Sequence, residues 1–109
     1  ETRRMFRHKK RCPDAVFVAN DHMAFGVMDT IRTELGMRVP EDVQIIGFDN
    51  VPQSAWAGYG LTTIEQNAQS MCDAAVSVLI ERILHQNQSH AKHIVVPVRL
   101  IERQTTLRV

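Results

Sequence analysis

The stretch DAVFVANDHMAFGVMDTIRTELGMRVPEDVQIIGFDN, residues 14–50, decides the fold of this chain. Its first run, Ala15–Ala19, is continuously apolar, which predicts a strand buried on both faces. A second apolar run covers Val43–Phe48, and a helical pattern separates the two. A strand, helix and strand of this length imply two parallel strands joined by a right-handed crossover.

The segment between the two runs carries the signals of a helix over residues 21–35. Asn20 and Asp21 are residues that favour a helix start, and Gly36 lies where a left-handed cap is expected. One apolar stripe follows at helical spacing: Ala24, Val27, Met28, Ile31 and Leu35. This helix supplies the crossover between the predicted strands.

A polar pair closes each predicted strand, Asn20-Asp21 after the first and Asp49-Asn50 after the second. The crossover places both pairs on the carboxyl edge of the sheet, where open parallel sheets bind ligands. Asn20 can donate and accept, and an ionised Asp49 accepts strongly, so the two suit a hydroxylated or polar-edged small molecule. Singly, each is better explained as a helix cap or turn former. As a pair on one edge they favour binding.

Length and composition indicate one ordinary soluble domain of 109 residues, 44% of them apolar and 23% charged. A net charge of +1 speaks against binding to nucleic acid or a membrane surface by charge alone. No apolar signal core follows the basic N-terminus, so secretion finds no support. Because the first residue is not Met, we expect the true N-terminus to lie upstream. Cys12 and Cys72 lack a metal or redox spacing, which indicates reduced thiols in a cytoplasmic protein.

Motifs of catalysis and metal binding are missing from the sequence. It contains no G-x-S-x-G, no glycine-rich phosphate loop and no H-E-x-x-H. His90 and His93 lie in a polar loop without a third ligand, so neither a metal nor a cofactor is expected. Asp21 and Asp49 could form an acid–base pair, but no nucleophile or cofactor accompanies them. The chain is therefore not expected to be an enzyme.

Aromatic residues suggest a contact surface. Phe25 lies off the apolar stripe, where it either caps the core or faces a partner. Trp56 and Tyr59 lie in a long loop, residues 50–60, and either fold back as a lid or make a subunit contact, which we favour. A two-fold interface needs one self-complementary patch. The predicted dimer residues are Phe25, Met28, Val51, Trp56 and Tyr59.

The rest of the chain completes a three-layer α/β fold with a mostly parallel sheet. A short strand is predicted at 61–64, a helix at 66–86 and a final strand at 94–101, with Pro97 favouring an edge or bulge. The helix presents an apolar face: Ala68, Cys72, Ala75, Val76, Leu79 and Ile83. Ile80 and Leu84 lie opposite, which suggests that another body covers them.

The basic start, residues 1–11, has two interpretations. It is either a nucleic-acid patch or the solvated end of a helix anchored by Met5, and the second is favoured because the run is short and Phe6 is the only aromatic residue within it. The predicted helix ends at Pro13. A short run of cations is not by itself a groove-reading element.

Five short motifs, in this order and spacing, resemble the C-terminal part of the LacI/GalR family of bacterial transcription repressors. They are AND-x-MAxG at 19–26, RVPEDV at 38–43, GFDN at 47–50, LTTIEQ at 61–66 and LIERQTT at 100–106. The resemblance extends from about Pro13 to Thr106. It implies a type I periplasmic-binding-protein-like fold, of which residues 1–109 would be most of the C-terminal subdomain, without the N-terminal subdomain and the DNA-binding headpiece.

The same resemblance implies site residues and partners. Asn20 and Asp49 match positions that contact the effector, a sugar or a purine, and Gln66 lies near the cleft or hinge. The helix after Asn20 and the loop after Asp49 match the dimer surface. Operator DNA would be bound through the headpiece. No catalytic residue, cofactor or metal is implied.

Three functions are weighed: the effector-sensing part of a repressor, a fragment of a periplasmic sugar-binding protein of a transport system, and an α/β enzyme. The RVPEDV turn and LTTIEQ favour the repressor, because transport proteins generally lack both. A helix-turn-helix about 200 residues upstream would identify a repressor, and a signal peptide would identify a transport protein.

Overall fold

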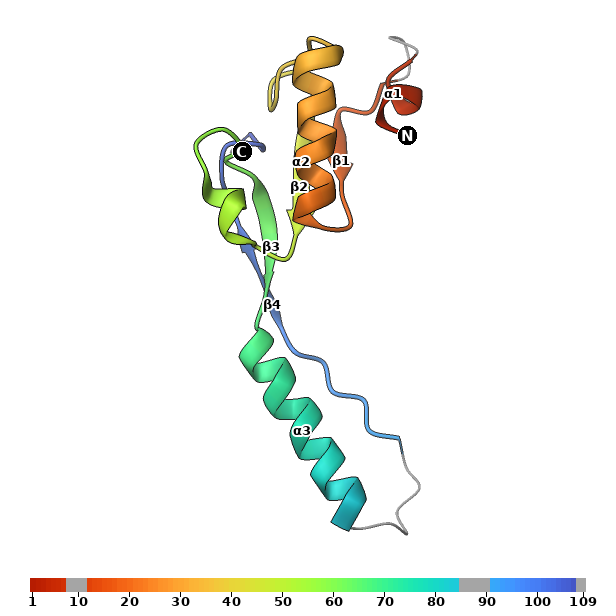
Figure 1. The fold of residues 1–109 in the computed structure, drawn as a ribbon, viewed down its shortest axis with the longest axis vertical. Coiled ribbons are helices and arrows are strands. Elements are labelled where there is room, and N and C mark those ends of the chain that lie inside the picture. Colours follow the sequence, from red (N-terminus) through yellow and green to blue (C-terminus); the bar gives the residue numbers. More distant parts are fainter. Residues whose placement is uncertain (8–11, 85–90, 108–109) are drawn as a thin grey trace. The chain divides into compact units, whose positions relative to one another are not determined.

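The computed structural model describes residues 1–7, 12–84 and 91–107 of the chain. They form helices and one four-stranded sheet (Figure 1), which confirms the α/β class. The chain divides into two compact units. Unit 1 comprises Glu1–Glu65 and Arg99–Val109, and unit 2 comprises Gln66–Val98. The second unit is thus a continuous insertion into the sequence of the first.

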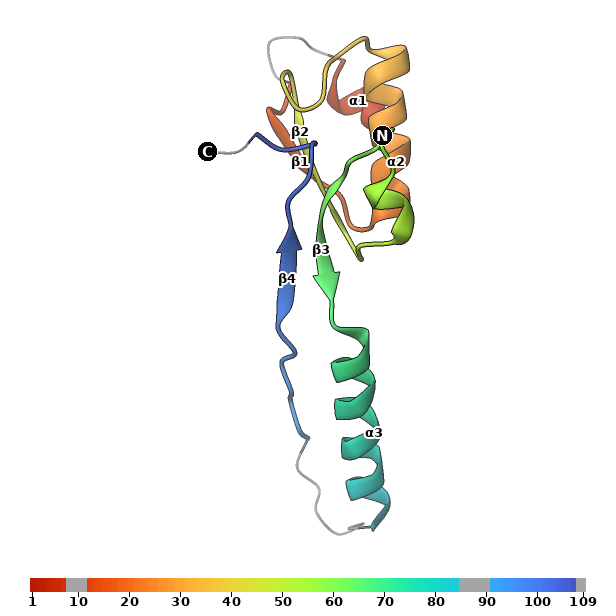
Figure 2. The ribbon, with the colours of Figure 1, turned by 90° about the vertical axis from the view of Figure 1, so that its left-hand side faces the viewer.

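The sheet has the order β1-β2-β3-β4, with β1 at Ala15–Phe17, β2 at Gln44–Phe48, β3 at Thr62–Gln66 and β4 at Val98–Ile101. The first three strands are parallel, in a register that places Ala15 beside Gln44 and Ile46 beside Thr62. β4 runs opposite to β3 (Figure 2). The predicted mostly parallel sheet is confirmed, and so is the predicted crossover between its first two strands.

The crossover helix is α2, Asp21–Asp29, which continues as a π-helical turn, η2, over Thr30–Glu34. Asn20 has the extended backbone of an N-cap, and its Oδ1 accepts from the Met23 amide at 2.8 Å. Gly36 follows the helix with a φ of +62°, the left-handed conformation predicted for it. Both helix boundaries thus follow local sequence signals.

The core of unit 1 lies between α2 and one face of the sheet. Its buried apolar residues are Phe6, Val18, Ala24, Phe25, Met28, Ile31, Val43, Ile45 and Leu61. Phe25 is only 9% exposed and belongs to this core, so the structure supports the first of its two interpretations, a cap on the core. The short helix α1, Thr2–Met5, is followed by buried Phe6, while Met5 is exposed and is not the predicted anchor.

The opposite face of the sheet is open. Phe17 is 60% exposed and forms an edge-to-face ring pair with Phe48, with ring centroids 6.4 Å apart. The continuous apolar run predicted that β1 is buried on both faces, and this prediction is wrong. The reason is that α2 covers one side, whereas no helix among the described residues of unit 1 covers the other.

Thr105, near the C-terminus, is hydrogen-bonded to both β2 and β3 of unit 1. It is fully buried, accepts from the Thr62 amide at 2.8 Å and donates to the Ile45 carbonyl at 2.7 Å. Its carbonyl also accepts from the Ile45 amide at 2.9 Å. Backbone groups of β2 and β3 are thus satisfied by a residue that follows unit 2 in sequence.

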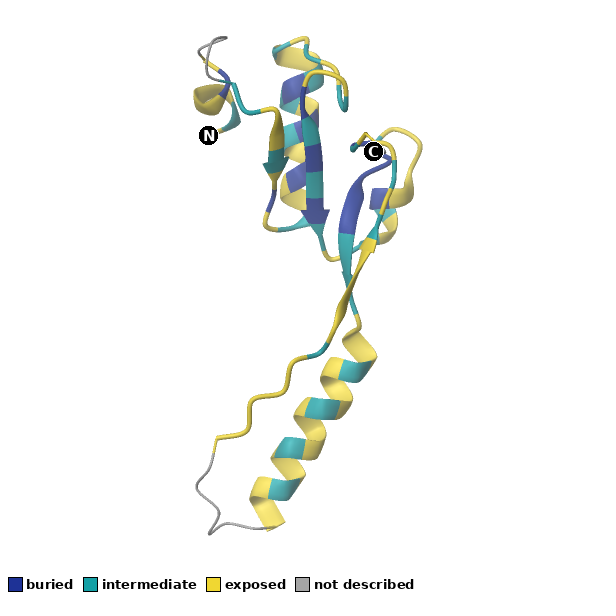
Figure 3. Ribbon diagram, turned by 180° about the vertical axis from the view of Figure 1, so that it is seen from behind, coloured by how far each residue is buried: buried dark blue, intermediate teal, exposed yellow. Residues whose placement is uncertain are grey.

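Unit 2 consists of α3, Ala68–Leu84, and the extended segment 91–97. No residue of α3 is buried, as the absence of dark blue on this helix shows in Figure 3. Ala74 and Val78 are half-buried, whereas all six predicted core residues are exposed. The predicted core face is therefore wrong for this chain, because the helix has only the segment 91–97 to pack against within the described part of unit 2.

Several predictions fall partly outside the described residues. Lys9, Lys10 and Arg11 of the basic start, His90 of the histidine pair, and the last two residues of the predicted helix 66–86 are among them. The predicted strand 94–101 begins only at Val98. Within the described ranges, no helix has both the length and the apolar character needed to cross a membrane.

Candidate functional site

The carboxyl edge of β1 and β2 is organised by the carboxylate of Asp21. This side chain is fully buried at the start of α2. Its Oδ2 accepts from the Val51 amide at 2.9 Å, and its Oδ1 accepts from the Thr63 hydroxyl at 2.6 Å. The helix start, the turn after β2 and strand β3 are thereby joined. The prediction that the two polar pairs are neighbours in space is confirmed by the Asp21–Val51 bond.

Gly47 makes room for this carboxylate. A Cβ at Gly47 would lie 2.3 Å from Asp21 Oδ1 and 2.9 Å from Leu61 Cδ2. Any side chain at this position of β2 would therefore displace a hydrogen-bonded carboxylate. Sequence reasoning missed this residue, although a single glycine inside a strand pattern is a signal of close approach.

The turn after β2 has an unusual backbone. Asp49 and Asn50 have φ values of 116° and 55°, the only positive φ values of non-glycine residues in the described part of the chain. Consecutive residues in this region persist only where their surroundings enforce them, and such strain gathers at functional sites. The Asp49 amide donates to the Ile64 carbonyl at 2.9 Å, and its side chain is exposed. The turn thus presents a carboxylate at the sheet edge.

The side chain of Asn50 holds this turn. Its Oδ1 accepts from Arg103 Nη2 at 2.7 Å and from the Ser54 hydroxyl at 3.3 Å. Its Nδ2 donates to Glu65 Oε1 at 2.8 Å. Because both ends of the amide are used within the chain, Asn50 shapes the turn, and Asp49 is the more exposed residue of the pair.

Two arginines complete the network around the turn. Arg103 also donates to the Leu61 carbonyl at 2.8 Å and to Ser54 at 3.1 Å. Arg99 donates to Glu65 Oε2 through Nε at 3.0 Å and Nη2 at 2.6 Å. The two bonds from Arg99, and then the bond from Asn50, hold the pKa of Glu65 below its ordinary value. Sequence reasoning assigned no role to either arginine, although Arg103 lies within the LIERQTT motif.

Asn20 and Asp49, two of the three predicted effector residues, lie at this edge. Asn20 is half-buried; its Oδ1 caps α2, and no described residue accepts a bond from its Nδ2. The edge therefore offers an amide donor after β1 and the exposed Asp49 carboxylate after β2. A polar small molecule needs such paired groups for orientation.

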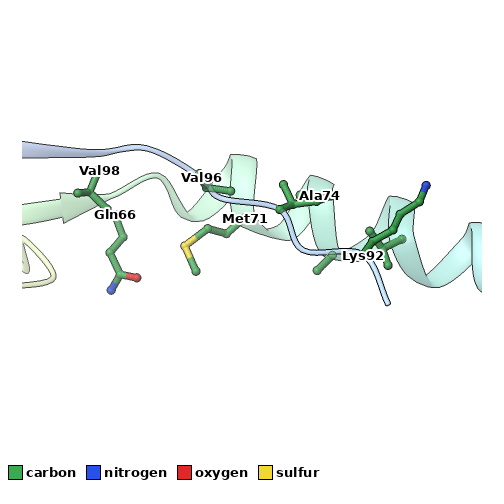
Figure 4. Close-up of a pocket in the computed structure, with 9 residues that line it drawn as sticks. Gln66, Met71, Ala74, Lys92, Val96 and Val98 are labelled. Atoms are coloured by element: carbon green, nitrogen blue, oxygen red, sulfur yellow. The ribbon is translucent and has the colours of Figure 1, made fainter. Parts of the chain in front are cut away.

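Gln66, the third predicted residue, ends β3 and belongs to unit 2. There it lines a groove of about 410 Å³ between α3 and the extended segment. Figure 4 shows Gln66 and Met71 at one end of this groove and Lys92 at the other. Its assignment to an effector site stays a prediction.

The predicted dimer residues differ in what they can offer a partner. Tyr59 stacks on Phe25 with ring centroids 4.3 Å apart, so the loop folds back on α2 as a lid. Met28 is fully buried within the chain and has no surface left for a partner. Trp56 is 59% exposed, and Val51 is half-buried. A dimer contact stays a prediction, and its best remaining support is Trp56.

In the part of the chain that the structure describes, no three His, Cys, Asp or Glu side chains are grouped so that they could hold a metal ion. The edge offers hydrogen-bonding groups, a capped helix start and a constrained turn. Such an arrangement can recognise and orient a molecule.

Comparison with known proteins places these features in a family. Residues 1–106 match the model of the periplasmic binding protein-like domain. The HTH-type transcriptional repressor PurR of Photorhabdus laumondii is 37% identical over 100 residues, which are 92% of this chain and 29% of the relative. The chain thus spans less than a third of the length of this curated relative.

Solved structures agree in fold. The Lac repressor dimer bound to operator and the anti-inducer ONPF matches 98% of this chain and 31% of its own, with a TM-score of 0.80 and 36% identity. A LacI-type transcription regulator from Bifidobacterium animalis subsp. lactis matches 98% of this chain and 37% of its own, with a TM-score of 0.77 and 40% identity.

Proposed function

This chain belongs to the periplasmic binding protein-like family and is an effector-binding region of the LacI/GalR type of regulator, and from its sheet edge we propose that Asn20 and Asp49 bind the small-molecule effector of a transcriptional repressor. The effector class is a sugar or a purine. The Asp49–Asn50 turn carries the proposal, because two successive left-handed residues held by a polar network present one carboxylate at the edge.

Chemistry at the edge supports recognition by hydrogen bonds. The Asp49 carboxylate is a strong acceptor for a hydroxyl or a ring N–H, and Asn20 Nδ2 can donate to a ring nitrogen or a hydroxyl oxygen. Asp21 fixes the distance between the two segments through Val51 and Thr63. Groups that are positioned before binding lose less entropy when the ligand arrives.

The remaining parts of the proposal concern the whole protein. We propose that residues 1–109 supply most of the C-terminal subdomain, that operator DNA is bound through a headpiece outside this chain, and that the protein works as a homodimer in the cytoplasm. The repressor relatives support these assignments. The apolar residues that α3 leaves exposed fit a chain that spans less than a third of its curated relative.

A ligand screen with the full-length protein tests the proposal. Free purine bases and a panel of mono- and disaccharides are first compared by the shift that each causes in the melting temperature, and those that raise it are titrated by calorimetry. One of the two classes is expected to bind, and Asn20→Ala is expected to weaken that binding. Undiminished affinity in both Asn20→Ala and Asp49→Gly would remove this edge from the site.

A further inference from the structure

The left-handed turn at Asp49 and Asn50 needs an external restraint. Neither residue is glycine, so the side chains oppose this backbone conformation, and the turn would relax without partners. The amides of Asp49 and Val51 are bonded to the Ile64 carbonyl and the Asp21 carboxylate. These bonds fix the ends of the turn, while its middle residue, Asn50, is held by its side chain and by a longer bond, 3.4 Å, from its amide to the Thr63 hydroxyl.

The carboxylate of Glu65 accepts the hydrogen bond that the side-chain amide of Asn50 donates. Glu65 Oε1 accepts from Asn50 Nδ2 at 2.8 Å, while Oε2 accepts two bonds from Arg99. The two carboxylate oxygens thus serve two different partners, one on the turn and one on β4. The Glu65 carboxylate is ionised at neutral pH, and the bonds from Arg99 and then from Asn50 lower its pKa further.

We propose that Glu65 is a positioning residue of the effector site, which holds the Asp49–Asn50 turn in its binding geometry through Asn50 and is itself oriented by Arg99. This inference rests on the proposed function, because it assumes that Asp49 meets the effector. Glu65 does not touch the effector in this scheme. It acts through the backbone of the residue that does.

The sequence position of the pair gives the inference a second consequence. Glu65 is the last residue of unit 1 before unit 2, and Arg99 is the first residue after it. The two points at which the chain leaves and re-enters unit 1 are therefore joined by this ion pair. Separation of β3 from β4 at these points would remove the ion pair that orients Glu65 and so weaken one of the bonds that hold Asn50, whose Oδ1 is also held by Arg103 and Ser54.

Loss of Glu65 and loss of Arg99 should open the turn to different extents. Arg99 has 72% of its side chain exposed, against 33% for Glu65, so the ion pair is screened by water and contributes little by itself. The bond between Asn50 and Glu65 is less exposed. We expect Glu65→Ala to increase the opening of the turn about tenfold and Arg99→Ala about threefold, on the usual worth of a charge-assisted bond.

Hydrogen exchange of the full-length protein without ligand tests the inference. The amides of Asp49, Asn50 and Val51 report the opening of the turn, and those of α2 report the stability of unit 1. Glu65→Ala should accelerate the first group while leaving the second unchanged. Glu65→Gln keeps an oxygen for Asn50 and should restore most of the protection. The matched control is Glu102→Ala, which removes an exposed carboxylate directly after β4.

Two results overturn the inference: unchanged exchange at the turn in Glu65→Ala, or acceleration that is equal in the turn and in α2. Its failure differs from a failure of the proposed function. If no purine or sugar binds the wild-type protein while the turn opens in Glu65→Ala, the restraint stands but its role in an effector site is lost. If a purine or sugar binds, Glu65→Ala should weaken it about tenfold, and equal affinity would also refute the inference.

Discussion

The contact between Gly47 and the Asp21 carboxylate can be tested by a double-mutant cycle. Gly47→Ala places a Cβ 2.3 Å from Asp21 Oδ1, which must then move. The carboxylate is not a loose side-chain end, because bonds from Val51 and Thr63 hold it. Overpacking costs roughly 1–3 kcal/mol, and weakening two charge-assisted bonds adds to it, so we expect a loss of about 3 kcal/mol.

Asp21→Ala removes the obstacle as well as the two bonds. It leaves the Val51 amide and the Thr63 hydroxyl without their acceptor, at a cost of about 3–5 kcal/mol. In this background, Leu61 Cδ2, at 2.9 Å, is the one of the three nearest atoms that remains beside the added Cβ of Gly47→Ala. Its cost should therefore fall to about 1 kcal/mol, which gives a coupling energy of about 2 kcal/mol between the two positions.

Native-state hydrogen exchange of the β2 amides, Gln44–Phe48, measures these free energies in the full-length protein, since it reports unit 1 separately from other parts. A global melting curve is less suitable because a protein of several domains need not unfold in two states. The matched control is Gly58→Ala, where an added Cβ meets nothing within 4 Å. If Gly47→Ala costs the same in both backgrounds, the proposed clash is refuted.

Three further predictions concern the turn, the loop and the acid range. Asp49→Gly removes the carboxylate without straining the left-handed backbone, so effector affinity should fall about tenfold to a hundredfold while the apo melting temperature is kept; unchanged affinity in calorimetry excludes Asp49. Trp56→Asp should shift the homodimer toward monomer in sedimentation velocity, and a wild type that is already monomeric at tens of micromolar contradicts the interface. The pKa of Asp42 is lowered from 3.8 to about 2, first by the side chain of Arg38 and then by its amide. Since the folded pKa is the lower one, the stabilisation from Asp42 is present above pH 3.8 and is lost as the pH falls toward 2. A carboxyl titration by NMR measures the pKa of Asp42. An ordinary pKa in the wild type, or no rise of the pKa in Arg38→Ala, contradicts this prediction.

Local signals in the sequence predicted the frame of unit 1. The Asn20 cap, the glycine after the helix and the two apolar runs each depend on near neighbours in the chain, and together they gave the parallel strands and their shared edge. Burial was predicted less well, because it depends on partners far away in sequence. Phe25 is covered by Tyr59, from a loop 34 residues later, and no periodicity reports such a contact.

The candidate site shows the same limit. Asn20 and Asp49 could be found because polar residues after parallel strands share an edge. The residues that restrain them could not, since Arg103 reaches Asn50 across 53 positions and Glu65 joins Arg99 across 34. The predicted core face of α3 was wrong for a different reason. Its apolar residues lie on more than one side, so the sequence alone does not say which side a given partner covers.

The role of Thr105 has a consequence for biosynthesis. A ribosome makes β2 and β3 before residues 66–98, so the amides of Ile45 and Thr62 emerge well ahead of Thr105, the residue that satisfies them. At about 5–20 residues per second, the delay between Thr62 and Thr105 amounts to roughly 2–9 s. During that interval, the nascent sheet exposes unpaired backbone groups, which neighbouring nascent chains can pair with and which a chaperone would have to shield.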